Sequence, residues 1–167
     1  MSFEHLRTLS LNPFLTAKIV QNFLEGYGTP ADIKLVFYVL PIIMSKDSRE
    51  VLATAKTTSR IETLFGTKKE YADTQLKISS RVNLSGFLER FEHLKDLTKL
   101  TLIVLSSENK ISINDNIALL KSSNFNKYSG NIRSMLKASF YLGVVFRKTN
   151  SESLDMYLGV SSVWRGT

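Results

Sequence analysis

The sequence predicts a mainly α-helical, α+β fold: a compact helical domain that carries one β-hairpin. Residues that favour helix starts recur along the chain, and apolar residues spaced by three and four positions follow them, as on one face of a helix. Near residue 110 the pattern changes to strand-like alternation around a polar turn. We expect one domain over residues 1–167, with a helical core at about 12–105, the hairpin at about 110–120 and C-terminal helices at about 130–160.

Composition excludes several classes of protein. The chain has 167 residues, no Cys and two His, which excludes a disulfide framework, a thiolate metal site and a Cys nucleophile. With 43% hydrophobic and 22% charged residues, the chain is typical of a globular protein rather than a disordered one. The most apolar run, Leu35 to Met44, is shorter than the roughly 20 residues that span a bilayer. The start lacks a signal peptide, so we expect a cytoplasmic protein.

The first helix is predicted to begin at Asn12 and Pro13. Asn caps helix N-termini, and Pro suits the first turn because its missing N–H has no partner there anyway. Gly26 and Gly28 are expected to end the helix. Its inward stripe is predicted to contain Phe14, Ala17, Ile19, Val20, Phe23 and Leu24.

A second helix is predicted to follow Thr29, with Thr29 as its cap, Pro30 at the first position and Asp32 in the first turn. Residues 35–44 are apolar on every side, which predicts a buried central helix. A buried strand is the competing interpretation, because the run is short and rich in β-branched residues. Pro41 is expected to kink or end the helix because it removes one backbone hydrogen bond.

Two short helices are expected next. Asp47 or Ser48 would cap the first, and residues 59–62 (Ser-Arg-Ile-Glu) match a capping box for the second, which Gly66 would end.

One or two helices are predicted for residues 70–91, with a break near residues 83–86, and a separate helix for residues 94–105. The residues of this last helix that are expected to face inward are Leu97, Leu100, Ile103 and Val104.

The hairpin is predicted from residues 110–113, which alternate polar and apolar, the turn Asn114-Asp115-Asn116, and a return strand at residues 117–120. A hairpin directly after helices is the outline of a winged-helix unit, so we expect a winged-helix-like fold. A polar loop at 122–129 and a helix from about Gly130 to Arg147 follow. Asn150 or Ser151 would start a last short helix, and the apolar tail at 159–164 is expected to dock or to add a short strand.

The positive charge is concentrated in one part of the chain. The formal net charge is +7, and residues 76–149 carry twelve basic and five acidic side chains. The segment from Lys121 to Lys148 has six basic residues and no acidic one. Such a segment suits a phosphate backbone or an acidic protein surface, and a solvated basic helix face is the open alternative. The residues predicted to contact DNA or an acidic partner are Lys127, Arg133, Lys137, Arg147 and Lys148.

No motif predicts catalysis, a metal site or a cofactor site. The eight glycines form neither a dinucleotide-binding nor a Walker pattern, and the turn at residues 114–116 lacks the spacing and the terminal Glu of a calcium loop. His93, beside Glu92 and Asp96, is more simply explained as a surface residue than as a general base. We therefore expect a non-enzymatic protein without cofactor or metal.

A set of motifs follows a characteristic order along nearly the whole chain. Its residues are Asn12-Pro13, Ala17, Phe23 and Tyr27, then Leu35 to Ile43 and Ser48 to Leu52, then Phe87-x-x-Arg90-x-x-x-Leu94 and Leu102 to Leu105, and finally Ala138, Leu142-Gly143, Phe146 and Leu158-Gly159-Val160. In this order they resemble the middle-component family of three-component ABC systems. These are bacterial conflict systems built around an SMC-like ATPase, and they include the Lamassu-type anti-phage and anti-plasmid systems. Val145 stands where the family pattern has Trp.

The resemblance implies a non-enzymatic adaptor or regulatory subunit of a hetero-oligomeric defence complex. It would bridge an SMC-like ABC ATPase and an effector, often a nuclease, and could restrain the effector until foreign DNA is sensed. DNA contact would be indirect or through non-specific phosphate contacts, and no membrane contact is implied. The alternative is a winged-helix DNA-binding transcriptional regulator, which the charge and the hairpin favour. Lys95 and Lys99 are the only basic side chains on helix 94–105, which argues against base reading by that helix.

Overall fold

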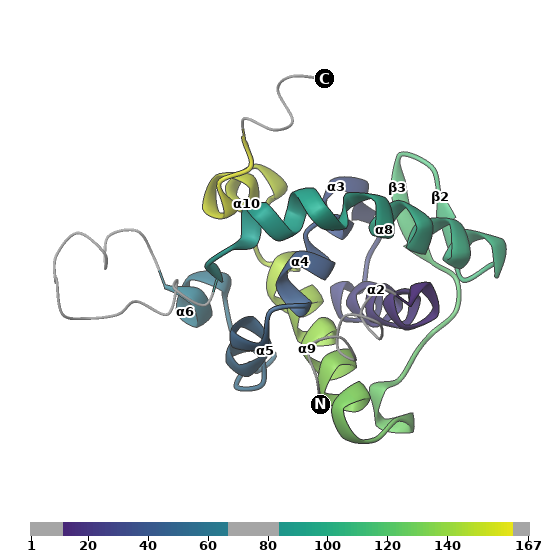
Figure 1. Cartoon of the computed structure of the whole chain (residues 1–167), viewed down its shortest axis with the longest axis horizontal. Helices are drawn as coiled ribbons and strands as arrows, with labels where there is room; N and C mark the ends of the chain where they lie inside the picture. Colours follow the sequence, from purple (N-terminus) through teal and green to yellow (C-terminus); the bar gives the residue numbers. More distant parts are fainter. Residues whose placement is uncertain (1–11, 67–83, 162–167) are drawn as a thin grey trace, which may run out of the picture.

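The computed structural model describes residues 12–66 and 84–161, and these residues have the mainly helical α+β architecture that the sequence predicts (Figure 1). Helices pack around a continuous apolar core, and a small antiparallel sheet lies at one end. In chain order the elements are α2 (Pro13–Tyr27), β1 (Ala31–Asp32), α3 (Ile33–Val36), α4 (Val39–Ile43), α5 (Lys46–Leu52), α6 (Ile61–Phe65), α8 (Phe87–Ser107), β2 (Ile111–Ile113), β3 (Asn116–Leu119), the 3₁₀ helix η2 (Phe125–Lys127), α9 (Gly130–Arg147) and α10 (Ser151–Leu158).

Helix α2 begins and ends where the sequence predicts. Asn12 is its N-cap, and Asn12 Oδ1 accepts a hydrogen bond from the backbone N–H of Phe14 at 2.9 Å. At the other end Gly28 takes the left-handed conformation, with φ of 78°. The placement of Phe14 in the inward stripe was wrong, because its side chain is 65% exposed. The buried face of α2 begins at Thr16, which lies about 200° around the helix from Phe14.

The second helix begins three residues later than predicted. Residues 31 and 32 form strand β1, and Asp32 rather than Thr29 is the cap of α3. Asp32 Oδ1 accepts a hydrogen bond from the backbone N–H of Lys34 at 3.1 Å. The pairing of β1 with the hairpin explains the shift, because it holds residues 31 and 32 in extended conformation.

The buried run of residues 35–44 forms two short helices rather than one. Helix α3 ends at Val36 and α4 begins at Val39, so that the break falls at Phe37 and Tyr38. Pro41 explains the position of the break, because a proline clashes with the carbonyl four residues before it, here that of Phe37. The interpretation as a buried helical segment is otherwise confirmed, since the side chains of both α4 and the second half of α3 are buried.

Two predicted caps were wrong. Ser45, not Asp47 or Ser48, caps α5, and Ser45 Oγ accepts a hydrogen bond from the backbone N–H of Ser48 at 3.4 Å. The predicted capping box makes Ser59 the N-cap of α6, but the N-cap is residue 60. Ser59 Oγ instead accepts a hydrogen bond from the backbone N–H of residue 56. The predicted end of α6 at Gly66 is confirmed.

Helix α8 joins two segments that the sequence analysis separated near residue 94. It runs for 21 residues without interruption and begins after Gly86, whose φ is 77°. Residues 84–86, the described part of the predicted break, lie outside α8, as expected. The helical residues predicted within 67–83 lie outside the described residues. Residues 92–94 contain neither Gly nor Pro, so nothing in that stretch ends a helix. The buried residues of α8 are Phe87, Phe91, Thr98, Thr101, Leu102 and Leu105.

The predicted hairpin is confirmed and belongs to a three-stranded sheet. Strands β2 and β3 pair antiparallel, with Ile113 opposite Ile117 and the predicted turn residues Asn114, Asp115 and Asn116 between them, and β1 pairs with the other edge of β3. A strand that follows the first helix thus pairs with the return strand of a hairpin, which is the connectivity of a winged-helix unit. Helix α8 directly precedes the hairpin and packs against α4, which lies beside it in Figure 1.

The C-terminal helices occupy their predicted ranges. Helix α9 runs from Gly130 to Arg147 as expected, and its buried face begins at Leu136, so that Ile132 near its start is exposed. Asn150 caps α10 as predicted, and Val160 in the tail is buried. The rest of the tail, from residue 162, lies outside the described residues.

Two glycines bring α2 and α9 into backbone contact. A Cβ atom built at Gly26 would lie 1.9 Å from the carbonyl oxygen of Phe140, and one built at Gly143 would lie 2.1 Å from that of Phe23. Neither position therefore accepts even a methyl group unless the two helices move apart. This helix pair has the most extensive contact of any two elements among the described residues.

We expect Gly143→Ala to destabilise the protein by at least about 3 kcal/mol. Overpacking of a core typically costs 1–3 kcal/mol, and here the obstacle is backbone, which cannot rotate away. The change in the midpoint of urea unfolding checks this value. Ser134→Ala, on the exposed first turn of α9, is the control, and an unchanged midpoint for Gly143→Ala would contradict the contact.

Candidate interaction surfaces

The five basic residues predicted to contact DNA or an acidic partner lie at two ends of α9. Lys127 in η2 precedes the helix, Arg133 and Lys137 lie in its first half, and Arg147 and Lys148 lie at its C-terminal end. Arg133 and Arg147 are fourteen residues apart, which is about 21 Å along a helix. The structure thus brings these residues together in two groups. Their contact with a partner stays a prediction.

Two of the five side chains form hydrogen bonds to neighbouring parts of the chain, Arg133 to a side chain of η2 and Lys148 to backbone carbonyls before α6. Arg133 Nη2 donates to Asn126 Oδ1 at 3.0 Å, and its guanidinium lies 5.6 Å from the centre of the Phe125 ring. Lys148 Nζ donates to the carbonyl of Thr57 and, at 2.8 Å, to that of Ser59. Arg133 therefore orders η2, and Lys148 orders the chain between α5 and α6.

Three other lysines converge on one carboxylate and form a group that the sequence analysis did not single out. Lys110 Nζ lies 2.5 Å from Glu108 Oε2. The hydrogen bond from Lys110 is the main cause that lowers the pKa of the Glu108 carboxyl, and desolvation opposes it. The charges of Lys110, Lys18 and Lys121 lower this pKa further, each by less. We call Lys18, Lys110 and Lys121 the lysine cluster. One carboxylate cannot neutralise three ammonium groups.

Backbone contacts fix two members of the lysine cluster side by side. Helix α8 ends with Asn109 in the left-handed region, at φ of 56°, and the N–H of Lys110 bonds the carbonyl of Leu105 at 2.9 Å. The carbonyl of Lys110 accepts from the N–H of Leu120 at 2.8 Å and from that of Lys121 at 3.3 Å. Lys110 and Lys121 thus flank the open end of the hairpin.

Two buried amides of α2 connect Lys18 with the same place. Gln21 Nε2 donates to the carbonyl of Lys121 at 2.9 Å. Asn22 Nδ2 donates to the carbonyl of Lys18 at 2.9 Å and to Ser123 Oγ at 3.0 Å. Since 92 residues separate Lys18 from Lys110, no local pattern in the sequence indicates that they meet.

The second half of α8 presents apolar side chains to solvent. Leu100 is 45% and Ile103 is 63% exposed, and Leu97 and Val104 beside them are half-buried. We call these four residues the α8 outer face. Only the half-buried pair touches the core, so the prediction that all four face inward was wrong for Leu100 and Ile103.

Two buried threonines turn the α8 outer face away from the core. Thr101 Oγ1 lies 2.6 Å from Thr16 Oγ1 on α2 and also donates to the carbonyl of Leu97 at 2.8 Å. Thr98 is buried on the same side of α8 as Thr101. Hydrophobic periodicity misses this arrangement, because it assigns the polar threonines to solvent and the leucines to the core.

Two arginines from the motifs named above support the broken central helix. Arg90 Nε donates to the carbonyl of Pro41 at 2.7 Å, and Arg49 Nη1 donates to that of Ile43 at 2.7 Å. Both carbonyls lie at the C-terminal end of α4, where a helix leaves acceptors unpaired. Burial lowers the pKa of both guanidinium groups.

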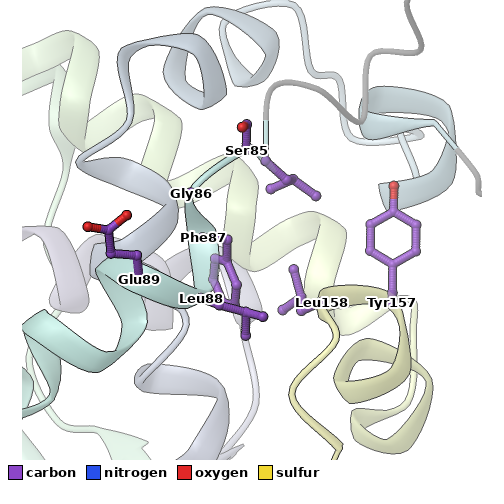
Figure 2. Close-up of a pocket in the computed structure, with 8 residues that line it drawn as sticks. Ser85, Gly86, Phe87, Leu88, Glu89, Tyr157 and Leu158 are labelled. Carbon is purple, nitrogen blue, oxygen red and sulfur yellow. The ribbon is translucent and has the colours of Figure 1, made fainter.

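A pocket of about 350 Å³ lies where the N-terminal end of α8 meets α10 (Figure 2). Leu88 and Leu158 face its interior, whereas the Glu89 carboxylate points away from Tyr157. Tyr157 directs its hydroxyl toward α6 and donates to the carbonyl of Gly66. The lining is mainly apolar and offers packing rather than a recognisable reaction.

The described residues contain neither a candidate metal-binding cluster nor a helix that could cross a membrane. No three His, Asp or Glu side chains among residues 12–66 and 84–161 are grouped so that they could hold a metal ion. No helix in those two stretches combines the length and hydropathy that crossing a bilayer requires.

We expect Glu108 to titrate below the usual range of a glutamate, because Lys110 donates a hydrogen bond to its charged form. Lys110→Gln removes that charge and should raise the pKa of Glu108 toward its ordinary value. Titration of the Glu108 carboxyl carbon by NMR measures both. Lys46→Gln, on α5, is the control that should leave the Glu108 titration unchanged, and an equal shift in both variants would contradict the pairing.

Comparison with known proteins places the chain in a family. No curated protein and no solved structure matches it. One family model matches residues 1–162 and is described as the ABC-three component (ABC-3C) system Middle Component 3. The match covers the helical core, the hairpin, the lysine cluster and the α8 outer face. The chain therefore belongs to the Middle Component 3 family of ABC-three component systems.

Proposed function

We propose that this middle component is a non-enzymatic adaptor that joins an SMC-like ABC ATPase to an effector, a nuclease in the simplest case. The complex would be cytoplasmic and of the Lamassu type, and would act against phages or plasmids. The adaptor would restrain the effector until the ATPase engages foreign DNA. Membership of a three-component system supports the existence of partner subunits, and the motif order described above supports their assignment.

The α8 outer face is the observation that carries this proposal. Leu100 and Ile103 are one turn apart on the same helix, which makes them neighbours on its surface. Leu97 and Val104 extend the apolar area along the same side. A contiguous apolar area of this kind marks an interaction site more often than scattered single residues do. Because the chain belongs to a multi-subunit system, we expect a partner subunit to bind the α8 outer face.

Bridging requires a second surface, and α8 supplies one at its other end. Leu88 is half-exposed at the rim of the pocket between α8 and α10. It lies fifteen residues from Ile103, which is about 22 Å along the helix. Two separated apolar surfaces on one rigid helix suit a subunit that holds two partners apart.

The composition of α8 argues against the alternative of a sequence-reading regulator. In a winged-helix unit the helix before the hairpin enters the major groove, and base reading needs hydrogen-bonding side chains there. The outward surface of α8 instead presents Leu100, Ile103 and a 98% exposed Asp96 side chain. Apolar groups donate no hydrogen bonds to base edges, and Lys99, a basic side chain on this surface, lies 3.9 Å from the Asp96 carboxylate.

The test is co-purification of the tagged protein with the products of its two adjacent genes. We expect the double variant Leu100→Ser and Ile103→Asn to reduce recovery of at least one partner by tenfold or more, because the contact is apolar. The fold should persist, since exposed substitutions typically change stability by only about 0.5 kcal/mol. Wild-type assembly should also survive high salt, which screens charge but not apolar contact.

Phe14→Ser is the matched control, because Phe14 is as exposed as Ile103 and lies on α2. It should leave recovery of the partners unchanged. Full recovery with the double variant would refute the role of the α8 outer face, and a wild-type protein that retains neither gene product would refute the adaptor function itself.

A further inference from the structure

The surface around the lysine cluster is rich in hydroxyl and amide side chains, and the proposed adaptor function assigns no role to it. Two segments meet there, residues 106–110 at the end of α8 and residues 121–126 after β3, joined by the backbone bonds between Lys110 and Lys121. Between them they contribute exposed hydroxyl and amide side chains, namely Ser106, Ser107, Asn109, Ser122, Asn124 and Asn126.

Positive charge dominates this surface. Glu108 is the one acidic residue in the two segments, and its carboxylate is committed to Lys110 at 2.5 Å. Lys18 and Lys121 have no ion pair with any residue of the parts of the chain that the structure describes. From residue 116 to residue 151 the chain contains no acidic side chain at all. The local field is therefore positive and open to an anionic ligand.

We propose that the lysine cluster, with the Ser- and Asn-rich segments beside it, binds the phosphate backbone of duplex DNA without reading its sequence. Ammonium groups attract phosphates as point charges, and Ser and Asn side chains commonly donate hydrogen bonds to phosphate and sugar oxygens. The three lysines come from α2, from the start of β2 and from the end of β3, so the folded backbone sets their relative positions.

An acidic protein is the other class of polyanion, and the composition of the surface disfavours it. Protein interfaces concentrate their binding energy in buried aromatic or aliphatic anchors. Residues 106–110 and 121–126 contain a single apolar side chain, Phe125, which is half-buried and packs against the core and the Phe140 ring. The exposed apolar residue that directly adjoins these two segments in the sequence is Leu120, which precedes Lys121. An acidic polypeptide would need Leu120, whereas a phosphate backbone would not.

The proposal differs from the prediction made from the basic segment 121–148. That prediction placed the contact on η2 and α9, at Lys127, Arg133, Lys137, Arg147 and Lys148. Here the site is built on the hairpin base and α2, and Lys18 and Lys110 lie outside the segment altogether. Substitutions at the two places therefore distinguish the two sites.

The test measures binding of a fluorescent duplex of arbitrary sequence to the full chain by anisotropy, as a function of salt. Each neutralised phosphate contributes about −0.9 to the slope of log K against log[salt]. Lys18→Gln together with Lys121→Gln should therefore make the slope shallower by about 1.8. Glu108→Gln releases Lys110 and should tighten binding and steepen the slope by about 0.9, a gain that misfolding cannot produce.

The matched control is Lys46→Gln with Lys56→Gln, which removes the same charge from α5 and the chain after it. This pair should leave the slope unchanged. Equal losses in the two double variants would show attraction to net charge alone and would overturn the site. Unaltered binding after loss of Lys18 and Lys121, or weaker binding after Glu108→Gln, would overturn it as well.

Polyglutamate is the probe for the other class of ligand. It should compete with the duplex only weakly, and Leu120→Ser should change nothing in duplex binding. Stronger binding of polyglutamate than of duplex, lost on Leu120→Ser, would overturn the proposal in favour of an acidic protein. None of these outcomes depends on the ATPase or the effector, so a failure here is distinct from a failure of the adaptor function.

Discussion

The backbone contact between α2 and α9 is the constraint on which the rest of the structure depends. Gly26 and Gly143 allow the two helices to touch, and Ser139 Oγ adds a hydrogen bond to the carbonyl of Ile19 at 2.6 Å. Helix α2 then receives α8 on another side and anchors the hairpin through the amides of Gln21 and Asn22. A shift of α2 would therefore displace both proposed contact surfaces together.

Polar groups inside the molecule determine which surfaces remain outside. The threonine pair between α2 and α8 sets the rotation of α8 and leaves Leu100 and Ile103 in solvent. A comparable polar contact fixes α10, because the buried carboxylate of Asp155 accepts from Lys34 Nζ at 2.6 Å and from the Tyr38 hydroxyl at 2.5 Å. Such groups are costly to bury without partners, so each contact favours a single orientation of its helix.

Local signals in the sequence predicted the elements that are themselves determined locally. The Asn12 cap, the hairpin turn and the bounds of α9 depend on neighbouring residues, and the structure confirms them. Pairing of β1 with β3 moved the cap of α3 to Asp32, and the Thr16–Thr101 contact rotated α8 so that Leu100 and Ile103 of its expected inward face are exposed. The lysine cluster was missed for the same reason, since its members meet only after the chain folds. Tertiary contacts of this kind override local propensity and periodicity.

The wide spacing in sequence of the α2–α9 contact also affects how the chain is made. Ile19 and Ser139 are 120 residues apart, and ribosomes add about 5–20 residues per second. The apolar face of α2 is therefore synthesised on the order of ten seconds before α9, the helix that covers it. During translation α2 is a surface that chaperones or fellow nascent chains can bind, and the backbone contact closes only once α9 has left the ribosome. The close fit between α2 and α9 thus forms only late in the synthesis of these two helices, although it stabilises the folded protein.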